Sequence, residues 1–157
     1  KLLEQVAEEE LEISNIICTI FNKQRDYASS KNIELKFSDK RKVKRIIKGD
    51  PFLIDLALSN LINNAIKFTK PGGTIAVAVK QDKEKIRVTV SDSGIGMDKD
   101  ACEKLFRIEE SRSTMGTHKE KGTGLGLLLC REFVQKHGGK IWAESEPNKG
   151  STFHFAI

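Results

Sequence analysis

Two glycine-rich loops, about thirty residues apart, constrain this chain more than any other feature. The first, Asp92 to Met97 (DSGIGM), ends an alternating apolar segment, and the second, Gly122 to Leu127 (GTGLGL), opens an apolar helical segment. One such loop alone is weak evidence, because glycine marks any tight turn. In this pairing, however, glycines let backbone N–H groups approach a ligand, and the N-terminus of the helix favours an anion.

Asp92 is the only carboxylate in the first loop. Its oxygens can accept a hydrogen bond from an exocyclic amine. A purine amine at the first loop and phosphates at the second together describe ATP, and we therefore predict an ATP site.

Composition narrows the class of protein. A length of 157 residues fits one domain with its own core, and 38% apolar with 31% charged residues is typical of a folded globular chain. No apolar run approaches the roughly 18 residues of a membrane span, and the N-terminus carries no signal pattern. The chain begins with Lys rather than Met, so we expect a piece of a longer protein.

Cysteine usage and charge argue against two further classes, disulfide-stabilised proteins and nucleic-acid-binding proteins. The three cysteines are scattered without a C-x-x-C pair, which favours reduced thiols in the cytosol over a disulfide framework. The net charge of +5 is concentrated in a basic run over residues 36–48, where Phe37 is the only aromatic residue. No nucleic-acid motif accompanies this run, so we predict a solvated strand-turn-strand edge and no nucleic-acid partner.

The hydrophobic pattern predicts a series of alternating elements. These are a helix with an apolar stripe from Leu3 to Tyr27, strands at 33–37 and 43–48, a helix from Asp50-Pro51 to about Phe68, strands at 75–79 and 86–90, a short helix over 99–106, a helix from the second glycine loop to about His137, and strands at 141–143 and 153–157. A long polar stretch over 109–124 predicts a functional lid or a disordered loop. The fold class is predicted to be an α/β two-layer sandwich, with helices packed on one face of a mixed sheet.

Asn60, Asn64 and Lys67 share one face of the predicted helix over 50–68, since they lie at i, i+4 and i+7. A polar face on an exposed helix is common and needs no function. The alternative is a wall that faces a polyphosphate and its metal ion. Mg²⁺ keeps most of its waters, so the Asn64 amide oxygen and phosphate oxygens would suffice as ligands, while Lys67 would neutralise phosphate charge.

Four segments of the chain resemble, in order, the conserved boxes of sensor histidine kinases. Residues 60–69 (NLINNAIKFT) resemble the N box, 92–97 the G1 box, Leu105-Phe106-Arg107 the F box and 122–127 the G2 box. The match extends from about residue 50 to the end of the chain. It identifies the chain as a member of the GHKL ATPase superfamily. The resemblance implies the Bergerat fold, with a five-stranded sheet and a mobile ATP lid.

The resemblance also implies roles for single residues on the central helix and beyond it. Asn64 resembles the Mg²⁺ ligand, and Lys67 a phosphate contact. Asn60 resembles the polar partner that places the phosphates, and Arg107 the arginine that reaches the γ-phosphate, so these two are the predicted catalytic residues. Phe68 occupies the place where many relatives have an aromatic residue beside the adenine or ribose.

In the first loop, Asp92 resembles the acceptor of the adenine amine, sharing a water with Thr152. Gly94 and Gly96 permit the tight turn beside the base, and Met97 completes the predicted adenine loop. The lid hinge and the phosphate-facing helix start are predicted at Gly122, Thr123, Gly124, Leu125, Gly126 and Leu127.

No histidine of the chain precedes an acidic residue as a phosphoacceptor would. His118, His137 and His154 are predicted to be structural or exposed. The resemblance then implies that the acceptor lies in an upstream dimerisation and phosphotransfer domain, with residues 1–27 leading in from it and 28–157 forming the catalytic ATP-binding domain.

The implied cofactors are ATP and Mg²⁺. The implied macromolecular partners are the dimerisation and phosphotransfer domain and a response regulator receiver domain. We expect this piece to be monomeric and cytoplasmic, and its parent to be a homodimer that is either free or anchored in the inner membrane.

Two other functions compete with a kinase. GHKL-type ATP hydrolases usually carry a Glu as general base four residues before the metal-binding Asn, but this chain has Asn60 there, and an amide cannot accept a proton near neutral pH. Asn60 therefore favours a histidine kinase. A catalytically silent nucleotide-binding regulatory module is the second alternative, and the presence of Asn64, Lys67, Asp92 and Arg107 argues against it.

Overall fold

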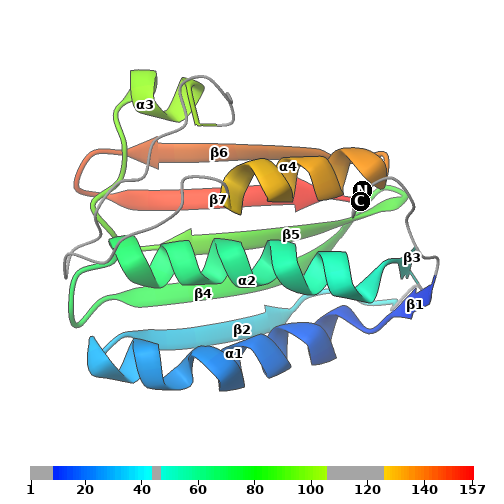
Figure 1. Cartoon of the computed structure of the whole chain (residues 1–157), viewed down its shortest axis with the longest axis horizontal. Helices are drawn as coiled ribbons and strands as arrows, with labels where there is room; N and C mark the ends of the chain where they lie inside the picture. Colours follow the sequence, from blue (N-terminus) through cyan, green and yellow to red (C-terminus); the bar gives the residue numbers. More distant parts are fainter. Residues whose placement is uncertain (1–8, 44–46, 106–125) are drawn as a thin grey trace.

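A five-stranded sheet carries helices α1, α2 and α4 on one face (Figure 1). The computed structural model describes residues 9–43, 47–105 and 126–157. The elements in chain order are β1 (Glu9–Leu11), α1 (Ile13–Ser30), β2 (Glu34–Asp39), β3 (Ile47–Gly49), α2 (Pro51–Phe68), β4 (Thr74–Asp82), β5 (Lys85–Asp92), α3 (Lys99–Glu103), α4 (Gly126–Lys136), β6 (Lys140–Glu146) and β7 (Gly150–Ala156). Among the described helices, none has the length and apolar character that crossing a membrane requires.

The sheet is mixed, in the strand order β2-β4-β5-β7-β6. β2 pairs with β4 in parallel, and α2 lies in the crossover between them. The pairs β4–β5, β5–β7 and β7–β6 are antiparallel. The predicted two-layer α/β sandwich with a mixed five-stranded sheet is therefore confirmed.

The core lies between the sheet and the three long helices. Strand residues two apart share a face, so the predicted alternation puts one apolar row of each strand under the helices. Val77 faces Val90 across β4 and β5, and Val88 faces Phe155 across β5 and β7, each with at most 1% of its surface exposed. The same register carries Asp92, the last residue of β5, onto the helix-covered face of the sheet.

The start of the chain differs from the predicted helical stripe. Residues 1–8 lie outside the described part, and Glu9–Leu11 forms a strand that pairs with β3, so the prediction of a helix through these positions is wrong. Pairing with 47–49 satisfies the backbone at the point where Glu10 interrupts the apolar stripe. α1 then begins at Ile13 and buries its apolar residues, Ile17 among them, in the common core. That residues 1–27 lead in from another domain stays a prediction.

Most helix ends agree with the sequence signals. Asp50 caps α2 by accepting N–H hydrogen bonds from the next turn, and Gly138, with φ of +73°, follows α4. α3 ends at Glu103, short of the predicted limit at Phe106, which lies outside the described residues. The strand predicted over 43–48 is present as 47–49, outside the main sheet, and 44–46 are not described.

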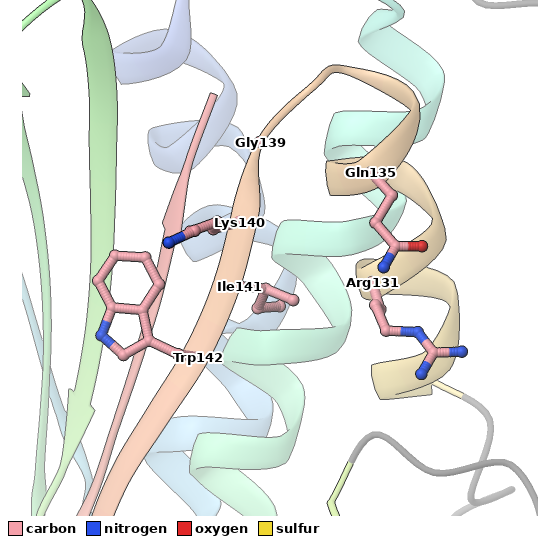
Figure 2. Close-up of a pocket in the computed structure, with 6 residues that line it drawn as sticks. All are labelled: Arg131, Gln135, Gly139, Lys140, Ile141 and Trp142. Carbon is pink, nitrogen blue, oxygen red and sulfur yellow. The ribbon is translucent and has the colours of Figure 1, made fainter.

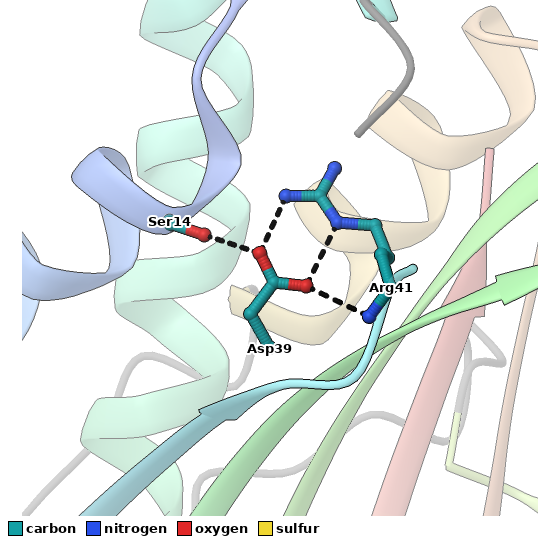
Figure 3. A network of polar contacts seen from close by, with 3 residues as sticks. All are labelled: Ser14, Asp39 and Arg41. Carbon is teal, nitrogen blue, oxygen red and sulfur yellow. Dashed lines mark hydrogen bonds and ion pairs between the residues drawn. The ribbon is translucent and has the colours of Figure 1, made fainter. Parts of the chain in front are cut away.

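Arg41, in the described part of the basic run, is a buried cation, and Figure 3 shows its polar contacts. The Arg41 guanidinium binds both carboxylate oxygens of Asp39, at 2.9 and 2.8 Å, and the Ser14 hydroxyl donates to Asp39 at 2.9 Å. Only 5% of the Arg41 side chain is exposed. The interpretation of this run as solvated is therefore wrong at Arg41, because the carboxylate of Asp39 makes burial of the guanidinium possible.

Candidate functional site

Asp92 uses one of its two carboxylate oxygens within the protein. Oδ1 accepts hydrogen bonds from the backbone N–H groups of Gly94, at 2.9 Å, and Ser151, at 3.2 Å. No described residue donates to Oδ2. Burial raises the pKa of this carboxyl group above its ordinary value, and the two N–H groups oppose the shift. The arrangement leaves one acceptor oxygen for a ligand amine.

The first glycine loop is packed between the end of α2 and the β6–β7 turn. A Cβ atom at Gly94 would lie 2.4 Å from the carbonyl oxygen of Phe68, and one at Gly96 would lie 1.9 Å from that of Glu146. Gly96 also has φ of +68°. A side chain at either position would displace the backbone beside Asp92, which is the physical reason for glycine here.

The turn between β6 and β7 closes the loop from its other side. Ile95 accepts a hydrogen bond from the Asn148 N–H at 2.7 Å, and the Met97 N–H donates to the Ser145 hydroxyl at 2.8 Å. Met97 therefore contributes its backbone to holding the loop.

The Asn60 amide is an unusual feature of α2. Its Nδ2 is buried and has no hydrogen-bond partner among the described residues. The amide abuts the start of α4, since a Cβ atom at Gly126 would lie 3.2 Å from Asn60 Oδ1. Leaving a buried N–H donor without a hydrogen bond costs free energy. We therefore expect an acceptor atom of a ligand to lie beside Asn60 Nδ2.

Asn64, Lys67 and Phe68 continue this face toward the glycine loop. Asn64 is half-buried, and Lys67 is buried with its Nζ 4.9 Å from the centre of the Phe68 ring. Phe68 lies eight positions after Asn60, which corresponds to about 12 Å of helix. The polar face therefore extends from the start of α4 to the loop that holds Asp92.

Thr152 lies on the other face of the sheet from the Asp92 side chain. Residues directly opposite in an antiparallel pair share a face, and Asp92 is opposite Ser151 whereas Thr152 is opposite Ser91. The Thr152 hydroxyl lies 3.2 Å from the Ser91 hydroxyl. The structure therefore puts Ser151, which the sequence reasoning missed, beside Asp92. The alternation of Phe153 and Phe155 into the core was the signal that could have identified it.

The structure describes only some of the residues predicted for the phosphate side of the site. Gly126 and Leu127 begin α4, and Leu127 is half-buried against the core. The remaining predicted site residues lie outside the described residues and are Arg107, Gly122, Thr123, Gly124 and Leu125.

The two described histidines have structural contacts, as predicted. His137 Nδ1 lies 2.8 Å from the Phe133 carbonyl oxygen, and its Nε2 accepts the Asp50 N–H at 3.3 Å. His154 Nε2 lies 2.8 Å from Glu144. His118 lies outside the described residues.

A cavity of about 440 Å³ lies elsewhere, at the β6 edge of the sheet (Figure 2). Arg131 and Gln135 of α4 border it on one side of β6, and Trp142 points to the other side. No predicted site residue lines this cavity, so we assign it no part in the predicted site.

The described site fits a magnesium-bound nucleoside triphosphate. Asp92 Oδ2 can accept from an exocyclic amine, and the orphaned Asn60 Nδ2 can donate to a phosphate oxygen. Between them, Asn64 offers an amide oxygen of the kind that Mg²⁺ accepts, and Lys67 offers a positive charge.

Comparison with known proteins supports an ATP-binding domain. Residues 49–157 match the family described as histidine kinase-, DNA gyrase B-, and HSP90-like ATPase. The adaptive-response sensory kinase SasA of Synechococcus elongatus is 40% identical over 112 residues, which are 69% of this chain and 28% of that protein. This chain therefore spans under a third of the length of that relative.

Solved structures of histidine kinases are also similar to this chain. The catalytic domain of histidine kinase ThkA superposes with a TM-score of 0.80 at 31% identity, over 96% of this chain and 94% of that one. ThkA in complex with the response regulator protein TrrA gives a TM-score of 0.77 at 27% identity, over 96% of this chain and 41% of that one. The chain thus belongs to the histidine kinase-, DNA gyrase B- and HSP90-like ATPase family, as an ATP-binding catalytic domain of the kind found in sensor histidine kinases.

Proposed function

We propose that this chain is the ATP-binding half of a two-component sensor histidine kinase, and that it positions Mg-ATP for transfer of the γ-phosphate to a histidine. That histidine would lie on a dimerisation and phosphotransfer domain of the same protein, and a receiver domain would take the phosphoryl group from it. The observation that carries the proposal is that two polar groups lie at opposite ends of the α2 face, one that accepts from no described residue and one that is buried without a partner among the described residues. One is Asp92 Oδ2, and the other is the buried Asn60 Nδ2.

The adenine end selects the base. Asp92 Oδ2 accepts a hydrogen bond from the exocyclic amine, while Gly94 and Ser151 hold Oδ1 and so fix the direction of the carboxylate. A guanine would present a carbonyl oxygen at the same place, which repels a carboxylate. This geometry supports ATP rather than GTP as the substrate.

The phosphate end orients the triphosphate. Phosphoryl transfer needs positioning and charge neutralisation more than a protein nucleophile. Asn60 donates to a phosphate oxygen, Lys67 contributes positive charge, and Asn64 holds the metal ion. When bound there, Mg²⁺ would supply positive charge that offsets the charge of the triphosphate. Arg107, which lies outside the described residues, stays a predicted contact of the γ-phosphate.

The acceptor and the partners come from outside this chain. A histidine imidazole is itself nucleophilic, so it does not need the general base that Asn60 cannot provide. ThkA is known in complex with a response regulator protein, which supports a receiver domain as the downstream partner here. A homodimeric parent, a monomeric piece and a cytoplasmic location remain parts of the proposal.

Phosphotransfer in trans tests the proposal. The chain is mixed with the purified dimerisation and phosphotransfer domain of its parent and with γ-labelled Mg-ATP. We expect acid-labile, base-stable label on the histidine of that domain. Asn64→Ala should abolish the label, and Asn63→Ala, on the exposed side of the same turn, should leave it unchanged.

Two results would contradict the proposal, each in favour of a different alternative. Tight ATP binding without any label on the acceptor would favour a silent regulatory module. Brisk release of phosphate without acceptor, undiminished in Asn60→Ala, would favour an ATP hydrolase.

A further inference from the structure

Lys31 is a buried lysine whose ammonium group binds the end of a distant helix. It follows α1 directly, and only 1% of its surface is exposed. Its Nζ donates to the carbonyl oxygens of Ile66, at 2.9 Å, and Lys67, at 3.1 Å, both in the last turn of α2. A buried ammonium is costly unless it is paired, and the carbonyl end of a helix is a favourable partner for a cation.

All four final carbonyl groups of α2 have partners, and Lys31 serves two of them. The last four carbonyls of a helix have no partner within it. Here the Thr69 hydroxyl donates to Ala65 at 2.6 Å, and the Ile95 N–H donates to Phe68 at 3.1 Å. The two carbonyls between them receive the ammonium of Lys31.

The backbone of Lys31 fixes the next turn as well. Its carbonyl oxygen accepts the Gly72 N–H at 2.9 Å, between α2 and β4. Lys31 therefore holds the end of α2 by its side chain and the following turn by its main chain. The part that it holds carries Lys67 and Phe68, and Phe68 in turn receives the N–H of Ile95 in the loop of Asp92.

The positive charge of Lys31 also offsets the partial negative charge at the C-terminus of α2. The C-terminus of a helix carries partial negative charge, which disfavours a nearby phosphate. Lys67, the proposed phosphate contact, lies in that last turn. A cation bound to the carbonyl oxygens of the same turn offsets their negative charge beside Lys67, whose ammonium group is proposed to meet the phosphates.

We propose that Lys31 is a positioning residue of the nucleotide site, which holds the last turn of α2 and cancels the negative charge of its carbonyl end. The inference rests on the proposed function, because it needs Lys67 to meet the phosphates of a bound nucleotide. Lys31 does not contact the nucleotide; it acts through the backbone of Ile66 and Lys67.

The test compares a triphosphate with a nucleoside on variants of the whole chain. Lys31→Met keeps most of the side-chain length and removes the cation. We expect affinity for a non-hydrolysable Mg-ATP analogue to fall roughly ten- to thirtyfold, and adenosine affinity, which depends on the Asp92 loop that Phe68 holds, to fall by a clearly smaller factor. Lys31→Arg, which restores a cation with N–H donors, should recover part of the loss. The matched control is Lys70→Met, an exposed lysine two residues beyond α2, which should change neither affinity.

Thermal unfolding shows whether Lys31→Met is folded, and NMR of the wild-type chain tests the role of Lys31 without a substitution. If Lys31→Met does not fold, NMR of the Lys31 ammonium decides: the ATP analogue should shift its resonance, and adenosine should not. An unshifted resonance would overturn the inference, and so would equal losses of both ligands. If the wild-type chain binds no ATP analogue, the proposed function itself fails. If it binds the analogue and Lys31→Met binds equally well, only the role of Lys31 is wrong.

Discussion

The backbone N–H of Ser151 donates to Oδ1 of Asp92 across the β5–β7 pair, with 3.2 Å between nitrogen and oxygen. This contact joins positions 59 residues apart in the chain. It takes up the carboxylate oxygen that faces the protein and leaves Oδ2 for a ligand. Sheet register thereby determines which oxygen of Asp92 is left to accept a hydrogen bond from the proposed nucleotide.

Replacing Asp92 by Asn should separate binding from folding. Asn can keep the oxygen that accepts from Gly94 and Ser151, but it puts an NH₂ donor where an adenine amine also donates. We expect the affinity for a non-hydrolysable ATP analogue to fall by about 2 kcal/mol or more in calorimetric titration. The control is Asp98→Asn, since Asn also caps helices well and should preserve α3. Unchanged affinity in Asp92→Asn would remove Asp92 from the site.

Asn60→Ala should weaken triphosphate binding without lowering stability. The Asn60 Nδ2 is buried without a partner, so its removal relieves an unsatisfied donor. We expect the free energy of unfolding to stay equal or to rise by up to about 1 kcal/mol, while affinity for the ATP analogue falls about tenfold. Urea unfolding and calorimetry measure the two quantities. Asn63→Ala, whose amide is exposed, serves as control, and a destabilised Asn60→Ala would show that Asn60 has a structural role.

Asp39→Asn should destabilise the fold and change its response to acid. The buried Arg41 guanidinium holds the pKa of the Asp39 carboxyl far below its usual range. The ion pair therefore stabilises the protein above the ordinary carboxyl pKa of 3.8, and this stabilisation is lost as the pH falls below it. Asp39→Asn leaves a buried cation without its anion and should cost about 3–5 kcal/mol at neutral pH.

Urea unfolding at neutral and acidic pH checks this prediction. In Asp39→Asn the loss of stability with acid should be shallower than in wild type. Glu34→Gln, which removes an exposed ion pair with Lys36, should change stability by less than about 1 kcal/mol. Equal effects of the two substitutions would contradict a structural role for the Asp39–Arg41 pair.

His154 should make stability fall below neutral pH. Burial and, after it, the charge of Arg87 lower the pKa of this imidazole below its ordinary 6.5, although Glu144 opposes the shift. Between the lowered pKa and 6.5 the unfolded chain binds more protons, so the contribution to stability is present above 6.5 and is lost as the pH falls. Chemical unfolding followed from about pH 7.5 to about pH 5 should show this loss, and His154→Gln should reduce it. An identical pH profile in the variant would exclude His154 as the cause.

Local patterns were enough to predict most elements of the fold. The helix Pro51–Phe68 has its N-cap and proline at the start, and the β4 and β5 strands alternate with period two. Each of these signals acts over a few residues of the chain, so the sequence contains it directly. The short strand Glu9–Leu11 was missed because its partner, β3, lies 36 or more residues away.

The candidate site, like the fold, has features that the sequence predicts and features that only the tertiary structure decides. The sequence by itself determined the chemical set of the candidate site (Asn60, Asn64, Lys67 and Asp92) and the glycines beside it, because residue type and local spacing select them, and their roles in nucleotide binding stay predictions. Only the tertiary structure decided that Ser151 rather than Thr152 lies beside Asp92, that Arg41 is buried, and that Lys31 binds the end of α2. Strand register and packing between distant segments determine these contacts, and a distant partner leaves no periodic signal in the sequence.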